Sequence, residues 1–140
     1  MYVEPYLFLD GRCEEALDFY KEALRAEVTA LIRFKESPDP TMVHGGQDPN
    51  KILHAVFKIG DTMIMTSDGR NTGNPTFQGF ALSIAVANEA EAEKTFKALS
   101  DGGRVEMPLT KTFFSPRFGM VFDRFGVCWM VIVMQQPPRP

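Results

Sequence analysis

The chain has 140 residues, of which 44% are apolar and 24% charged, a balance typical of a domain that buries a core without disulfide or metal support. Its 15 Lys and Arg residues against 18 Asp and Glu residues give a net charge of −3, which argues against nucleic acid as a partner. No stretch approaches the ~20 apolar residues of a membrane span and the N-terminus lacks a signal-peptide pattern, so we expect a cytoplasmic protein with no membrane partner.

The first half of the chain predicts the element order β-α-β-β-β. A short apolar run at 6–9 predicts a strand, and apolar residues at helical spacing predict an amphipathic helix over 13–25. A loop rich in Pro and Gly is expected over 36–51. Three further strands are predicted, at 27–35, 52–59 and 63–67.

The second half of the chain predicts the same element order. A strand is predicted at 80–86, and Asn88 is expected to cap a helix in which Glu91 reaches back to complete a capping box. Gly102-Gly103 supplies the end of that helix. Three more strands are predicted, at 104–112, 119–122 and 128–134.

The two patterns begin about seventy-five residues apart, which indicates an internal duplication in an α+β fold. We expect both modules to form one domain, with this division: a first βαβββ module at 1–70, a connector at 71–78, a second βαβββ module at 79–134 and a Pro-rich tail at 135–140. Because one helix covers only one face of its sheet, the other face is free to pair or to bind a ligand.

Short motifs spread over almost the whole chain carry a family resemblance. They are Pro5-Tyr6-Leu7-Phe8, Glu15-Ala16-Leu17-Asp18-Phe19-Tyr20, His54-Ala55-Val56-Phe57-Lys58-Ile59-Gly60-Asp61, Met65-Thr66-Ser67-Asp68, Gly79-Phe80 and Asp123-Arg124-Phe125-Gly126-Val127-Cys128-Trp129-Met130. In this order and spacing they resemble the PhnB-like branch of the vicinal oxygen chelate superfamily, which includes glyoxalase I, bleomycin-resistance proteins and extradiol dioxygenases. The resemblance implies glyoxalase-like, cupped mixed β-sheets with the helices on the outer face, and commonly a homodimer.

The resemblance also locates the superfamily's metal positions. Metal-dependent members take His, Glu or Gln ligands from four inward-facing strand positions, which the resemblance places here at Pro5, Met65, Phe80 and Met130. None of these side chains offers the nitrogen or oxygen ligand that a catalytic divalent cation needs. We therefore expect no inherited metal site and no cofactor.

Strand alternation extends those four positions into a surface. Their period-two neighbours are predicted to point inward as well: Leu7, Leu9, Met63, Ser67, Leu82, Ile84, Cys128 and Ile132. Such a cup is apolar and rich in adaptable methionine, and suits a small hydrophobic or planar molecule. The predicted ligand-binding residues are Leu7, Met63, Met65, Ser67, Phe80, Leu82, Met130 and His44; the alternative is that the methionines and Phe80 pack together as core.

The two histidines are the candidates for polar chemistry. His54 lies in a predicted strand and is the candidate catalytic residue, as a general base near pH 7 or as a ligand anchor; the alternative is a hydrogen-bonded structural residue. His44 lies in the long loop, and approaches a ligand if that loop folds over the cup; the alternative is an exposed side chain with no role.

Other reactive or charged residues are given structural roles. Cys13 and Cys128 lack the spacing of a redox or zinc motif and are expected to be small buried hydrophobes. The basic residues of the second half are expected to be solvated surface charges: Arg104, Lys111, Arg117 and Arg124. Phe113 and Phe114 form an aromatic loop that predicts a lid or, preferably, a dimer contact.

Three functions remain after these exclusions. Some relatives carry a quinone methyltransferase label, but the two strand-to-helix turns, Asp10-Gly11-Arg12-Cys13 and Ala87-Asn88-Glu89, lack a glycine-rich cradle for S-adenosylmethionine, so methyl transfer is not expected. The leading hypothesis is a small-molecule-binding protein with an apolar cup and no metal. The alternatives are a superfamily enzyme of lyase, isomerase or dioxygenase type with a relocated metal or base involving His54, and a dimeric scaffold with a self-filled core.

Overall fold

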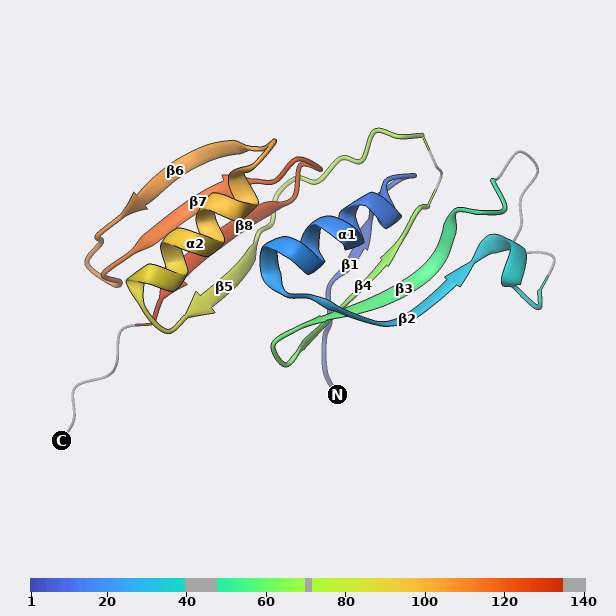
Figure 1. Ribbon diagram of the computed structural model, residues 1–140, viewed down its shortest axis with the longest axis horizontal. Coiled ribbons are helices and arrows are strands. Elements are labelled where there is room, and N and C mark those ends of the chain that lie inside the picture. The colour runs from blue at the N-terminus through green and yellow to red at the C-terminus, as the bar shows by residue number, and fades with distance from the viewer. Residues whose placement is uncertain (40–47, 70–71, 135–140) are drawn as a thin grey trace. The chain divides into compact units, whose positions relative to one another are not determined.

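A computed structural model describes residues 1–39, 48–69 and 72–134 (Figure 1). The chain divides into two compact units, Met1–Thr76 and Phe77–Pro140, and the division falls within the predicted connector. Within the described residues, each unit contains one α-helix and one four-stranded mixed sheet. The predicted α+β fold with two βαβββ modules is therefore confirmed, whereas their union into one domain stays a prediction.

The first unit follows the predicted order of elements. They are β1 (Tyr6–Phe8), α1 (Cys13–Leu24), β2 (Glu27–Arg33), a 3-10 turn η1 (Phe34–Glu36), β3 (Ile52–Ile59) and β4 (Thr62–Ser67). The strands lie in the order β1-β4-β3-β2, with β1 parallel to β4 and the other neighbours antiparallel. Because β4 returns beside β1, residues from the two ends of the module become neighbours in the sheet (Figure 1).

Helix α1 packs its apolar stripe on one face of this sheet. The buried ring of Tyr20 stacks on Phe57 of β3 with centroids 5.4 Å apart. The start of the helix is fixed by Asp68, whose buried carboxylate accepts hydrogen bonds from the backbone N–H groups of Cys13, at 2.8 Å, and Ile52, at 2.6 Å. One side chain thus satisfies donors from both the helix and β3, which would otherwise be buried without a partner.

The second unit repeats the first. Its elements are β5 (Leu82–Val86), α2 (Glu89–Ser100), β6 (Arg104–Thr110), β7 (Phe118–Phe122) and β8 (Cys128–Val133). The strand order is β5-β8-β7-β6, again with the first strand parallel to the last. Strand β5 begins 76 residues after β1, and α2 begins 76 residues after α1, which agrees with the offset predicted from the sequence.

Helix α2 packs on its sheet through Ala92, Phe96 and Leu99. The approach is close, because a Cβ added to Gly119 of β7 would lie 2.8 Å from a ring carbon of Phe96. The turn between β7 and β8 is held by the buried Asp123, whose carboxylate accepts a hydrogen bond from the indole N–H of Trp129 at 2.8 Å.

The N-terminal cap of α2 is partly as predicted. The side chain of Asn88 accepts a hydrogen bond from the N–H of Glu91 at 2.8 Å, which confirms the cap. The Glu91 carboxylate accepts from the N–H of Ala87, at 3.2 Å, instead of from Asn88. The second half of the predicted capping box is therefore wrong by one residue, since the Glu91 side chain reaches past the cap.

Both helices are 12 residues long. Across the described ranges, no helix has the length and apolar character needed to cross a bilayer.

Candidate ligand-binding surface

One face of the first unit's sheet lies opposite α1, and we call it the open face. Residues paired in register share a face, so its members follow from the pairings of Tyr6 with Met65, Phe8 with Ser67 and Met65 with Val56. The other face belongs to α1, because Thr66 lies beside Cys13 of the helix, with 3.5 Å between their side-chain oxygen and sulfur. On β1, β3 and β4 the open face includes Tyr6, Phe8, His54, Val56, Lys58, Met63, Met65 and Ser67.

An aromatic and polar cluster occupies the open face. The hydroxyl of Tyr6 is hydrogen-bonded to Nδ1 of His54 at 2.9 Å. The Tyr6 ring lies 5.6 Å from the imidazole and 4.9 Å from the ring of Phe8, measured between centroids. Ser67 lies on the same face, and its hydroxyl accepts from the N–H of Gly69 at 3.0 Å.

The electrostatics of this cluster keep the phenol of Tyr6 neutral. Burial raises the pKa of Tyr6, and the hydrogen bond with Ser67 only partly opposes that increase. At pH 7 the Tyr6 hydroxyl is therefore protonated and can act as a hydrogen-bond donor.

A cleft of about 370 Å³ adjoins this cluster at Phe8. Its lining consists of Phe8, Asp10, Gly69, Asn74, Pro75 and Thr76. Asp10 holds the far wall in place, because its carboxylate accepts from the N–H and hydroxyl of Thr72 and its carbonyl accepts from Gly73. The volume is within the range of pockets that hold small organic molecules.

Comparison with known proteins gives the family of the chain. Residues 2–132 match the family described as 3-demethylubiquinone-9 3-methyltransferase. The chain belongs to this family. It is 34% identical to Protein YjdN of Escherichia coli (strain K12) over 145 residues, which cover 99% of both chains.

Solved structures place the family among glyoxalase-like folds. Protein PA1353 from Pseudomonas aeruginosa is 38% identical, with a TM-score of 0.83, over 97% of this chain and 99% of that chain. A PhnB protein from Bacillus cereus is 26% identical, with a TM-score of 0.78, over 95% and 99%. A glyoxalase-related enzyme from Fulvimarina pelagi, 16% identical over 95% and 87%, has a TM-score of 0.63 and shares the fold. The resemblance to the PhnB-like branch is thus confirmed.

The structure brings together several residues that the sequence predicted for the site. Met63, Met65 and Ser67 lie on the open face with His54. Tyr6 and Phe8, which form the centre of the cluster, were missed by the sequence analysis. The in-register pairing of β1 with β4 is the signal that finds them, because it places Tyr6 beside Met65.

The prediction that Leu7 and Leu9 share a face with Met65 is wrong. Leu7 pairs with Thr66 and is 1% exposed, so it lies in the core beneath α1. The alternation was counted from Pro5, which precedes the first residue of β1. An error of one residue in that starting point moves every following side chain to the opposite face.

The same error occurs in the second unit. Leu82 pairs with Trp129 and Ile84 with Val131, on the face covered by α2, whereas Met130 pairs with Ser83 on the other face. Leu82 and Ile84 therefore do not share a face with Met130. Phe80 precedes β5, is about half exposed, and its ring lies 6.3 Å from that of Phe77.

Two further site predictions have these outcomes. His44 lies outside the described residues. Among residues 1–39, 48–69 and 72–134, no three His, Cys, Asp or Glu side chains gather in a group that could hold a metal ion. The pairings place Tyr6 beside Met65 and Ser83 beside Met130 on the faces away from the helices, and none of these four side chains is a carboxylate or an imidazole.

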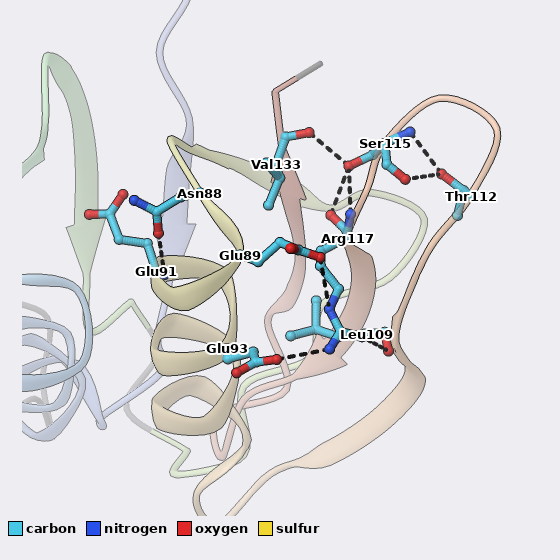
Figure 2. A network of polar contacts seen from close by, with 9 residues as sticks. All are labelled: Asn88, Glu89, Glu91, Glu93, Leu109, Thr112, Ser115, Arg117 and Val133. Carbon is cyan, nitrogen blue, oxygen red and sulfur yellow. Dashed lines mark hydrogen bonds and ion pairs between the residues drawn. The ribbon is translucent and has the colours of Figure 1, made fainter. Parts of the chain in front are cut away.

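The described arginines of the second unit are paired with carboxylates. Arg117 donates to Glu93 at 2.8 Å and lies 3.6 Å from Glu89, so it ties β7 to the first turns of α2 (Figure 2). Figure 2 also shows Ser115 donating to the carbonyl of Val133 at 2.7 Å, which closes the loop before β7. These contacts indicate that Arg117 stabilises the fold of the unit.

Arg104 and Arg124 have similar partners. Arg124 lies 3.3 Å from Asp101, and Arg104 lies 2.6 Å from Glu106 and stacks over the ring of Phe122. Arg104 and Arg124 therefore do not converge on one anion-binding position.

Both cysteines are free and buried. Burial raises the pKa of Cys13 to about 12, and burial also raises the pKa of Cys128. At pH 7 both side chains are neutral thiols, which agrees with the prediction that they act as small apolar residues.

Proposed function

We propose that the protein binds a small hydrophobic or planar molecule on the open face of its first sheet. The observation that carries the proposal is the exposure of two aromatic rings beside a cleft: Tyr6 is 36% exposed and Phe8 is 60% exposed, and Phe8 lines the cleft. A large aromatic ring exposed at a concave surface is typical of a ligand-binding site.

The chemistry around these rings supports a mostly apolar ligand. Met63 and Met65 supply flexible side chains that adapt to ligands of different shape. Tyr6 and His54 supply a small number of polar groups, which is the usual composition of a small-molecule site.

Two features favour binding over methyl transfer, the activity that the family's description names. The turns before α1 and α2 contain one glycine and none, so neither resembles a glycine-rich cradle. In addition, the N–H of Cys13 at the start of α1 already donates to the Asp68 carboxylate, so this helix end is occupied by an anion of the protein itself.

Titration with planar aromatic compounds tests the proposal. Thermal unfolding is followed for the wild type, Phe8→Ala and the control Val105→Ala, which removes an exposed apolar side chain from β6 of the second unit. We expect a compound that binds to raise the melting temperature of the wild type and the control, and to leave that of Phe8→Ala unchanged, because binding to the native state alone stabilises it.

Two results would contradict the proposal. One is that no compound in the series stabilises the wild type. The other is formation of S-adenosylhomocysteine when the protein is incubated with S-adenosylmethionine and a quinol, because binding alone produces no turnover.

A further inference from the structure

The donor and acceptor of each hydrogen bond on the open face can be assigned in turn, starting from the N–H of Gly69. The N–H of Gly69 is an obligatory donor, and it donates to the hydroxyl oxygen of Ser67 at 3.0 Å. Ser67 is 6% exposed, so its hydroxyl hydrogen needs a partner within the protein. The Ser67 hydroxyl acts to lower the pKa of Tyr6, as expected if its hydrogen points toward the Tyr6 oxygen, and we assign Ser67 as the donor to that oxygen.

The same reasoning makes Tyr6 the donor and His54 the acceptor in the next hydrogen bond. Because the Tyr6 oxygen accepts from Ser67, its own hydrogen is available for Nδ1 of His54, 2.9 Å away. A neutral imidazole that accepts at Nδ1 carries its hydrogen at Nε2. Within the described ranges, the structure shows no hydrogen-bond partner for Nε2.

We propose, on the basis of the proposed function, that His54 offers an Nε2–H donor to the bound molecule, which is therefore a planar aromatic compound with an oxygen acceptor such as a ring carbonyl. The rings of Tyr6 and Phe8 contact the aromatic part, and His54 binds the oxygen. This arrangement selects ligands by one polar group on an otherwise apolar surface.

This assignment changes the role expected of His54. A general base needs a free lone pair close to the proton that it removes. Nδ1 of His54 is already bonded to Tyr6, and Nε2 carries the hydrogen. The geometry therefore favours a ligand anchor over the general base that was one of the two roles predicted from the sequence.

Two probes of the same shape test the ligand class. 9-Fluorenone is planar and carries one ring carbonyl, whereas fluorene has a CH₂ group in its place. We expect the wild type to bind 9-fluorenone roughly 3- to 10-fold more tightly than fluorene in calorimetric titrations, which is the contribution of one hydrogen bond. His54→Phe keeps a planar ring without a donor, and should bind both probes with the wild-type affinity for fluorene.

The tautomer is measured directly, without a ligand. Long-range ¹H–¹⁵N correlation spectra distinguish a protonated from an unprotonated ring nitrogen, and the spectrum of His54→Phe identifies the His54 signals. We expect an unprotonated Nδ1 and a protonated Nε2 in the wild type. Tyr6→Phe removes the fixed donor and should give a mixture of tautomers; thermal unfolding of each variant establishes that it is folded.

The outcomes separate this inference from the proposed function. Equal affinity of the wild type for both probes, or a protonated Nδ1, overturns the inference and leaves binding on the open face intact. Failure of the wild type to bind either probe overturns both. Preference for 9-fluorenone that survives in His54→Phe shows that another group binds the carbonyl, and also overturns the inference.

Discussion

The hydroxyl of Tyr6 lies 2.9 Å from Nδ1 of His54, although the two residues are 48 positions apart in the sequence. Tyr6 belongs to β1 and His54 to β3, and β4 lies between these strands in the sheet. The contact therefore crosses a strand on the face opposite α1. It joins the aromatic residues of β1 to His54, the residue that the sequence indicated as a candidate catalytic residue or ligand anchor.

Replacement of Asp68 should destabilise the first unit. Asp68→Asn keeps one oxygen acceptor but cannot accept from both Cys13 and Ile52, so one buried backbone N–H loses its partner. We expect the free energy of unfolding, measured with urea, to fall by roughly 1–3 kcal/mol. Asp61→Asn, at an exposed turn position, is the matched control and should change it little; equal stability of both variants would contradict this role for Asp68.

Gly119 should tolerate no larger residue while Phe96 is present. In Gly119→Ala the new methyl group lies 2.8 Å from the Phe96 ring and 3.0 Å from the carbonyl oxygen of Met107, so we expect a loss of ~1–3 kcal/mol in unfolding free energy. Gly119→Ala combined with Phe96→Leu should show a favourable coupling energy in a double-mutant cycle. Additive effects of the two changes would show that the helix does not limit the size of residue 119.

Cys13 should be unreactive in the folded protein. Burial raises the pKa of its thiol from 9.0 to about 12, so the reactive thiolate is scarce at pH 8. We expect iodoacetamide to alkylate Cys13 in urea and to leave it unmodified under native conditions, as measured by mass spectrometry of peptides. Rapid native alkylation at Cys13 would contradict its burial beneath the sheet.

The same pKa predicts a dependence of stability on pH. The unfolded chain loses the Cys13 proton near pH 9 and the folded chain near pH 12, so the contribution of Cys13 is complete below pH 9 and is lost as the pH rises toward 12. Urea unfolding across this range should show a smaller decrease in Cys13→Ala than in the wild type. An identical decrease in the two proteins would refute the assignment.

The aromatic loop of the second unit predicts a dimer contact. Phe113 is 96% exposed and packs edge-to-face on Phe114, with ring centroids 5.1 Å apart. We expect sedimentation equilibrium to give the mass of a homodimer for the wild type and of a monomer for the double variant Phe113→Ala/Phe114→Ala. A monomeric wild type would contradict the predicted homodimer. A double variant that is still a dimer would show that the dimer contact does not involve Phe113 and Phe114.

Local patterns in the sequence determined the elements of this protein. The helices were found from apolar spacing and the Asn88 cap, and most strand ends lie within two residues of their predicted positions, because period and turn chemistry are properties of short segments. The absence of His, Glu or Gln from the four metal positions was also legible without a structure. The pairings place Tyr6 and Ser83, in place of Pro5 and Phe80, beside Met65 and Met130, and these two residues are also not His, Glu or Gln.

Which side chains share a face was decided by the tertiary structure. Strand β1 has three residues, all of them apolar or aromatic, so its own sequence does not reveal which of Tyr6, Leu7 and Phe8 faces the helix. The parallel register with β4 buries Leu7 beneath α1 and sets Tyr6 beside Met65, within reach of His54. A strand has two faces and a shift of one residue exchanges them, so only its pairing with a distant segment fixes the chemistry of the site.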